Sequence, residues 1–204
     1  MKQVFRKIRD IGRAQMQVRA LQELANASTR RIVVGSSGTR LTGWVSTDRQ
    51  TLDLLEPETW ARYFSPGSID AILAEHVWEH LTPEAALVAA KTCHRFLKTG
   101  GYLRIGIPDG KHPDPAYIES VRPGGTGPGA DDHKVLYTHA SARALFETAG
   151  FSVNLYEFFD DQGQFQFTDW DPAGGMIHRS KRFDERNTAK PLSYTSIVLD
   201  ALKP

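Results

Sequence analysis

Short apolar runs alternate with helix-forming segments through most of this sequence, and this alternation limits the possible fold more than any other feature. Arg31–Gly35 and Ser68–Ala74 are predicted to be buried strands, since each is apolar, short and bounded by turn residues. Thr82-Pro83 marks a helix start, with an N-cap hydroxyl followed by proline. Such an order predicts an α/β fold with a mostly parallel sheet, whose ligands bind at the carboxyl ends of the strands.

Two further features complete the first half of this pattern. Gly43–Asp48 is a weaker strand that ends on an acid, and Gly100-Gly101 is expected to cap the helix that begins at Pro83. Residues 36–42 are too few for the crossover helix that normally joins parallel strands. The later predicted elements are a strand over Tyr102–Ile107, a helix over His139–Ala149, and strands over Phe151–Tyr156 and Ser196–Ala201.

The N-terminal segment 1–28 is predicted to be an amphipathic helix. Its apolar residues recur at helical spacing, at Phe5, Ile8, Ile11, Val18 and Leu21. Basic residues then form its solvated face, although a phosphate-binding arm or a transit peptide would have a similar composition.

Composition limits the partners and the compartment. The formal net charge is +1, so neither nucleic acid nor an acidic membrane is expected as a partner. No apolar stretch has the length of a membrane span or a signal-peptide core, which points to the cytoplasm. Cys93 is the single cysteine, which excludes an internal disulfide and a multi-cysteine zinc site, and we expect it to be a buried apolar residue.

A glycine turn follows the first strand, at Gly35-Ser36-Ser37-Gly38. Glycine there lets the backbone approach a ligand, and Asp48 after the next strand would accept hydrogen bonds from ribose hydroxyls. Asp53, followed by Leu54, stands where a carboxylate would meet an adenine amino group. Each signal alone is equally consistent with an ordinary turn or a solvated acid.

Three sequence motifs that occur in a fixed order are a more specific signal of the protein family than the glycine turn or either acid alone. They are Ile69-Asp70-Ala71-Ile72, His76-Val77-Trp78-Glu79-His80 and Leu97-Lys98-Thr99-Gly100-Gly101. In this order and spacing they resemble the class I S-adenosylmethionine-dependent methyltransferases, and in particular a small branch of predicted methyltransferases marked here by Glu75-His-Val-Trp-Glu-His-Leu81. The resemblance is good over residues 30–110. It implies a Rossmann-like open sheet with an antiparallel last strand, preceded here by the N-terminal helix.

The same resemblance implies S-adenosylmethionine as the cofactor. One domain over 1–204 would consist of the helix 1–28, a cofactor-binding half 30–110, and a substrate half 111–204 with inserted loops at 111–132 and 160–191. The cofactor residues would be Gly35, Ser36, Ser37 and Gly38 beside the methionine part, Asp48 at the ribose, Asp53 and Leu54 at the adenine, and Glu75 and His76 near the sulfonium. The family's first motif usually has three glycines and a full helix, so a non-catalytic binding protein is an alternative.

The histidine pair has two interpretations. In the first, His76 lines the cofactor pocket while Glu79 and His80 orient the chain by hydrogen bonds. In the alternative, His76, Glu79 and His80 share a helix face and hold a divalent metal, with His133 or His139 as a fourth ligand. The enzymes that methylate the terminal ribose of small RNAs, and those of ubiquinone synthesis, resemble this stretch. Zinc peptidases have a similar motif, but here the motif directly follows a buried strand and stands among the methyltransferase motifs, which does not fit a peptidase.

The expected reaction is methyl transfer to a small hydroxylated or anionic acceptor, such as a sugar or a nucleotide. An oxygen acceptor needs a base, for which His76, His80 and His133 are the candidates, together with Glu75. The second inserted loop, 160–191, is called the insertion below. It supplies aromatic and charged side chains that suit such an acceptor: Phe165, Phe167, Trp170, Asp171, His178, Arg179, Lys181 and Arg182. A nicotinamide oxidoreductase is a further option, but the third glycine of its fingerprint is missing.

Overall fold

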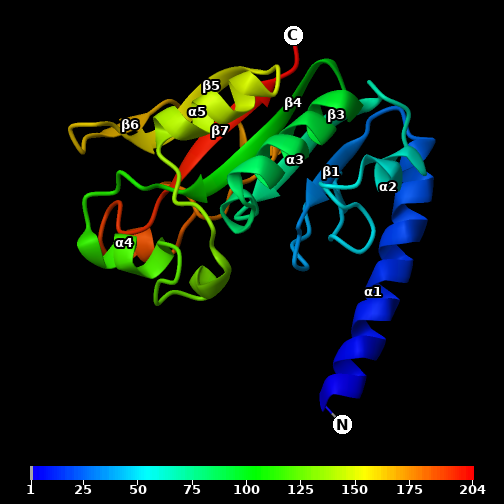
Figure 1. The fold of residues 1–204 in the computed structure, drawn as a ribbon, viewed down its shortest axis with the longest axis horizontal. Coiled ribbons are helices and arrows are strands. Elements are labelled where there is room, and N and C mark those ends of the chain that lie inside the picture. Colours follow the sequence, from blue (N-terminus) through cyan, green and yellow to red (C-terminus); the bar gives the residue numbers. More distant parts are fainter. Residues whose placement is uncertain (1) are drawn as a thin grey trace.

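A seven-stranded sheet in the order β2-β1-β3-β4-β7-β5-β6 forms the centre of the computed structural model (Figure 1). The model describes the backbone of residues 2–204 and the side chains from residue 12 onward. Parallel pairing joins β1 (Arg31–Val34) to β2 (Val45–Ser46) and to β3 (Ile69–Glu75), and joins β3 to β4 (Leu97–Pro108). The predicted α/β class and the parallel first half are confirmed.

The second half of the sheet is antiparallel. The chain's last strand, β7 (Ser196–Leu202), lies between β4 and β5 (Ser152–Phe159) and runs antiparallel to both. The short edge strand β6 (Phe165–Phe167) pairs antiparallel with β5 and was not predicted. The expected antiparallel last strand is therefore confirmed.

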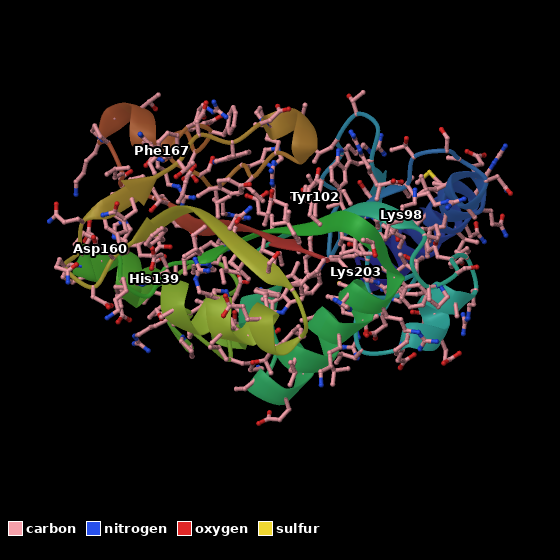
Figure 2. All side chains as sticks on the ribbon, turned by 90° about the horizontal axis from the view of Figure 1, so that it is seen from above. Lys98, Tyr102, His139, Asp160, Phe167 and Lys203 are labelled. Atoms are coloured by element: carbon pink, nitrogen blue, oxygen red, sulfur yellow. The ribbon has the colours of Figure 1, made fainter. Side chains whose placement is uncertain are left out.

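Successive side chains along each strand point to opposite faces of the sheet and pack into two separate hydrophobic cores. On β1, Ile32 and Val34 face the larger core, which α3 (Pro83–Phe96) and α5 (His139–Thr148) cover, whereas Val33 faces the other side. Figure 2 shows these two helices on one side of the sheet and the segment after β6 on the other. The smaller core contains Val33, Trp44, Ala71, Leu73, Trp170, Ile177 and Val198.

The connection between β1 and β2 lacks a crossover helix, as its length predicts. A helix there would normally cover one face of the sheet. Trp44 from the connection itself and Trp170 with Ile177 from the later insertion occupy that face instead. The insertion therefore has a structural role as well as a position close to the strand ends.

Helix α1 (Lys2–Ala25) lies beside β2 and extends away from the sheet toward its N-terminus (Figure 1). Leu21 and Leu24 near its C-terminal end are buried in the larger core, so this end anchors the helix. The predicted apolar face farther toward the N-terminus, at Phe5, Ile8 and Ile11, lies outside the described side chains. Among the described residues, no helix combines the length and the apolar character needed to cross a membrane.

The glycine pair after α3 does not cap that helix, so this prediction is wrong. The helix ends at Phe96, and Leu97 is already extended and begins β4. Gly101 lies against the end of the neighbouring strand, because a Cβ atom there would be 2.9 Å from the carbonyl oxygen of Asp70. The requirement at Gly101 is close backbone approach rather than helix capping.

The two inserted loops contain short regular elements. Asp114 caps α4 (Pro115–Val121) by accepting a hydrogen bond from the N–H of Ala116, and the 3₁₀ turn η2 (Ala130–Asp132) follows. The second loop contains the 3₁₀ turn η3 (Pro172–Gly174) and α6 (Arg186–Ala189). The remaining elements are α2 (Pro57–Ala61) and the 3₁₀ turn η1 (Trp78–His80), which lies between β3 and α3.

Candidate active site

The turn after β1 packs directly against the segment that follows β3. Gly35 has a φ of 59°, and a Cβ atom at this position would lie 2.6 Å from Cγ2 of Val77. Only glycine is compatible with both conditions, because the conformation is left-handed and the space is filled. Glycine at this position therefore sets the separation between the two walls of the site.

Asp48 holds the same turn in place. Its Oδ1 accepts hydrogen bonds from the N–H of Ser37 at 2.9 Å and from the hydroxyl of Ser36 at 3.2 Å. Its Oδ2 accepts one from the side-chain amide of Gln17 at 2.8 Å, and Arg13 lies 3.8 Å away. The carboxylate thus connects the turn to α1, and its contact with a ribose stays a prediction.

Glu75 ends β3 and His76 follows it, and the two residues have separate partners. His76 has a φ of 54°, its Nε2 lies 3.2 Å from the hydroxyl of Ser196, and its Nδ1 lies 2.9 Å from Oε1 of Glu79. A non-glycine residue in this region is uncommon, and such strain is concentrated at functional sites. The ring therefore has groups of the protein close to both of its nitrogens.

The Glu75 carboxylate binds the insertion. Its Oε2 accepts from Nδ1 of His178 at 3.0 Å, and its Oε1 accepts from the backbone N–H of Arg179 at 2.6 Å. Burial alone would raise the pKa of Glu75, but these hydrogen bonds hold it below its ordinary value. The same contact raises the pKa of the His178 imidazole. The two groups form an ion pair that attaches the insertion to the end of β3.

Glu79 is a fully buried acid whose carboxylate is poorly satisfied. Within the described part of the chain, neither of its oxygens makes a hydrogen bond, although Nδ1 of His76 is at ion-pair distance. Burial and the nearby Glu79 carboxylate raise the pKa of Tyr137 to about 12. A buried carboxylate without hydrogen bonds is costly, so this position favours a further partner beside the His76 ring.

His133 lies beside Glu79 with its tautomer fixed. Its Nδ1 is 2.7 Å from the carbonyl oxygen of Val121. Because a carbonyl only accepts, Nδ1 carries the hydrogen of the neutral ring and Nε2 keeps a free lone pair. One ligand atom each from Glu79, His80 and His133 lie within 4.8 Å of one another. This trio differs from the predicted set, since His133 takes the place of His76.

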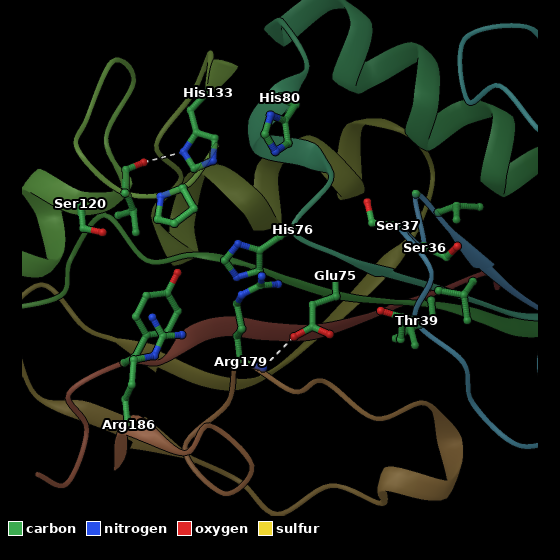
Figure 3. Close-up of a pocket in the computed structure, with 18 residues that line it drawn as sticks. Ser36, Ser37, Thr39, Glu75, His76, His80, Ser120, His133, Arg179 and Arg186 are labelled. Carbon is green, nitrogen blue, oxygen red and sulfur yellow. Dashed lines mark hydrogen bonds between the residues drawn. The ribbon is translucent and has the colours of Figure 1, made fainter. Parts of the chain in front are cut away.

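Two cavities adjoin at these residues. The larger, of about 380 Å³, runs from the glycine turn past Glu75 and His76 to Ser120 and the insertion (Figure 3). The smaller, of about 330 Å³, has Asp53, Leu54 and the segment after β3 in its walls. Four residues line both cavities: Gly35, Ser37, His76 and His80.

The smaller cavity has both polar and apolar walls. Oδ2 of Asp53 lies 3.0 Å from Nε of Arg49, and its Oδ1 accepts from the N–H of Leu55 at 2.9 Å. Leu54 and Leu81 supply apolar surface beside it. A flat ring with an exocyclic amino group would suit these surroundings, which are also those of the predicted adenine contacts.

The structure separates some of the predicted residues from the site. Asp48 and Gly38 are absent from the walls of both cavities, and His139 instead hydrogen-bonds the carbonyl oxygen of Phe159. Sequence reasoning missed Ser120, Arg186 and Tyr194, which line the larger cavity. No local pattern marks these three, because they come from α4, from α6 and from the chain just before β7.

The buried thiol of Cys93 is remote from this chemistry. Burial raises the pKa of Cys93 well above its ordinary value, which removes its nucleophilic form. The prediction that it is a buried structural residue is confirmed.

Comparison with known proteins agrees with this geometry. A family model described as a methyltransferase domain matches residues 48–105. These residues contain β3, the His76–His80 segment and most of β4. Over these residues the chain is similar to the methyltransferase-domain family.

Solved structures share this fold at low identity. A SAM-dependent methyltransferase from Thermotoga maritima is 15% identical, with a TM-score of 0.50 and all of both chains covered. A chain from the complex of the Haloferax volcanii Trm112 methyltransferase activator with a methyltransferase is 12% identical, with a TM-score of 0.50, and the match covers 95% of this chain and 94% of that one. No curated protein matches the sequence.

Proposed function

We propose that this methyltransferase transfers the methyl group of S-adenosylmethionine to a small hydroxylated or anionic acceptor, sugar-like or nucleotide-like in size. The observation that carries the proposal is the pair of adjoining cavities at the carboxyl ends of β1 and β3, which share Gly35, Ser37, His76 and His80. Ligands of this fold bind at these strand ends. The smaller cavity would hold the adenosine, and the larger would hold the methionine part and the acceptor.

The chemistry requires positioning more than covalent assistance. The methyl carbon forms a bond to an acceptor oxygen as its bond to sulfur breaks, and the acceptor loses a proton to a base. The protein's task is to align the two and to exclude water. His133 suits the base, because its Nδ1 is bound to Val121 and its Nε2 lone pair is free, whereas both nitrogens of His76 lie close to protein groups.

Binding of S-adenosylhomocysteine, measured by calorimetry, tests the cofactor assignment. Leu81 lines the smaller cavity and is partly exposed, so Leu81→Trp should fill the cavity and weaken binding about tenfold or more. Val88 is an exposed residue on α3 and lines neither cavity, so Val88→Trp is the matched control.

A wild-type protein that gains no thermal stability from millimolar S-adenosylhomocysteine would contradict the proposal. That result would favour the alternative of a non-catalytic binding protein on the same fold.

A metal-assisted version of the reaction has a specific observation in its favour. Glu79, His80 and His133 present ligand atoms within 4.8 Å of one another, and the Glu79 carboxylate lacks hydrogen bonds among the described residues. Two imidazoles and a carboxylate suit a divalent transition metal. A metal bound by these three residues would lower the pKa of an acceptor hydroxyl.

Titration with Zn²⁺ or Mn²⁺ tests this second candidate without an activity assay. Binding to the wild type should be lost in Glu79→Gln and kept in His139→Gln, because His139 is outside the trio. The metal hypothesis fails if the wild type binds neither ion, or if Glu79→Gln binds them equally well. Methyl transfer with His133 as the base would then remain.

A further inference from the structure

Arg179 brings a positive charge into the larger cavity, beside Glu75 and His76 (Figure 3). Its backbone N–H is bound to Glu75, which fixes the point where the side chain begins. Its guanidinium makes no hydrogen bond or ion pair with any side chain from residue 12 onward. All the donors of this group are therefore available to a ligand.

Arg186 lines the same cavity and is held in one orientation. Its Nε and Nη2 donate to the two oxygens of Asp184 at 2.8 and 2.6 Å, and its guanidinium lies 3.3 Å from the centre of the Tyr194 ring. This leaves Nη1 as the donor that these contacts do not use. A guanidinium fixed in this way loses little freedom when it binds a further oxyanion.

Two of the acids near these arginines, Glu75 and Asp184, are already engaged. Both oxygens of Glu75 accept hydrogen bonds from the insertion, at His178 and at the Arg179 backbone, and both oxygens of Asp184 accept from Arg186. The charge of Arg179 therefore has no direct counterion among the described groups. On the opposite wall, the Ser120 hydroxyl is a further donor, from α4.

We propose that Arg179, Arg186 and Ser120 form the binding site for a phosphate monoester on the methyl acceptor. A carboxylate has two oxygens, which a single guanidinium satisfies in a bidentate pair. Donors from three separate elements instead suit the three terminal oxygens of a phosphate. This assignment deepens the proposed function, on which it rests, by naming the acceptor as a phosphorylated small molecule.

Binding of inorganic phosphate to the full chain tests the site directly. Calorimetric titration at pH 7.5 should show phosphate binding that Arg179→Gln weakens about tenfold to a hundredfold, the effect of losing a charged hydrogen-bond pair. Arg179→Lys keeps the charge and should retain part of the affinity. Lys190→Gln is the matched control, because Lys190 is an exposed cation of the same segment and lines neither cavity.

Two further measurements separate this proposal from the cofactor assignment. Phosphate and S-adenosylhomocysteine should bind at the same time, and the affinity for S-adenosylhomocysteine should be unchanged in Arg179→Gln. Phosphate binding that depends on Arg179 would stand even if S-adenosylhomocysteine did not bind, and the proposed function alone would then fail.

The phosphate site is overturned by any of four results. They are no phosphate binding to the wild type, equal affinity in Arg179→Gln, equal or tighter binding of acetate, and competition between phosphate and S-adenosylhomocysteine. Acetate separates a general carboxylate site from a phosphate site, and competition would place the anion at the methionine end of the cavity.

Discussion

The backbone N–H of Ser37 donates a hydrogen bond to Oδ1 of Asp48 at 2.9 Å, which ties the glycine turn after β1 to the segment that follows β2. In a sheet with a full crossover helix, the helix would hold that turn. Here the connection has no helix, and a single carboxylate connects the turn to α1 through Gln17. The acid therefore supports, from behind, the turn whose Ser37 lines both cavities.

Replacing Asp48 with alanine should lower the free energy of unfolding by about 2–3 kcal/mol. The substitution removes three hydrogen bonds to a charged acceptor and leaves buried Ser36 and Gln17 without their partner. Urea denaturation measures the loss. Gln17→Ala should cost less, and the double variant should cost less than the sum, because the two residues share one network.

Asp169→Ala is the control for this series, since Asp169 is an exposed acid whose pairing with Arg182 should contribute under about 1 kcal/mol. If Asp48→Ala and Asp169→Ala lowered the free energy of unfolding equally, the Asp48 hydrogen bonds would contribute no more to stability than an exposed ion pair.

Gly35→Ala should destabilise the protein and weaken S-adenosylhomocysteine binding together. The left-handed φ costs an L residue about 1–2 kcal/mol, and the new methyl group would meet Val77 at 2.6 Å. Gly43→Ala has a similar positive φ but open space around it, so it should lower stability without affecting binding. Thermal unfolding and calorimetry separate the two effects.

The double variant Gly35→Ala/Val77→Ala removes the clash and keeps the strain. Recovery of binding in the double variant is expected. If the affinity stays low, the conformation of Gly35 is what matters rather than its contact with Val77.

The sequence predicted the parts of the fold that depend on local pattern. The buried strands at 31–35 and 68–74 and the Thr82-Pro83 helix start follow from hydrophobic periodicity and capping chemistry, which neighbouring residues determine. Gly100-Gly101 shows the limit of this approach. From the sequence, these two glycines are as consistent with a helix cap as with a strand. The need for glycine at position 101 is explained only by the neighbouring strand, whose Asp70 carbonyl oxygen lies close by.

The sequence named most of the candidate site from one segment, where Glu79 and His80 are adjacent in the chain. It named His133 as a candidate base and as one of two possible fourth ligands, but it could not choose between His133 and His139. His133 joins Glu79 and His80 from a loop more than fifty residues later, and its place in the trio follows from the hydrogen bond to Val121 on α4. Arg186 and Tyr194 have no spacing rule that links them to His76, since the sheet topology alone brings β7 beside β4.

The Glu75–His178 pair should make the attachment of the insertion depend on pH. The pKa of His178 is raised by Glu75, so its contribution is complete below the ordinary value near 6.5 and is lost as pH rises through the raised pKa. The pKa of Glu75 is lowered, so its contribution is complete above 4.5 and is lost as pH falls through the lowered value. The pair is strongest between about pH 4.5 and 6.5.

His178→Asn should therefore reduce stability most at pH 5–6 and least above pH 8. The effect should stay near 0.5 kcal/mol, because His178 is half exposed and solvent screens the pair. Urea denaturation of both proteins across this range gives the difference directly. A difference that grows toward pH 9 would contradict the ion pair.

Arg104 should control both stability and the order of the insertion, through different atoms. Its Nε and Nη2 donate to Asp200 at 2.8 and 2.9 Å inside the sheet, while its Nη1 donates to the carbonyl oxygens of Asp171 and Gly175 at 2.7 and 3.0 Å. Arg104→Met leaves Asp200 buried and unpaired, which should cost about 3–5 kcal/mol.

A second variant separates the two roles. Arg104→Met/Asp200→Leu removes both charges and should recover most of the stability, since an apolar pair of similar volume replaces a buried ion pair at little cost. The carbonyl anchors at Asp171 and Gly175 stay lost in both variants. Hydrogen exchange over residues 172–179 should therefore be faster in both than in the wild type, and phosphate binding through Arg179 should weaken in both. Wild-type exchange rates in the double variant would show that the insertion is held by Trp170, Ile177 and Glu75 alone.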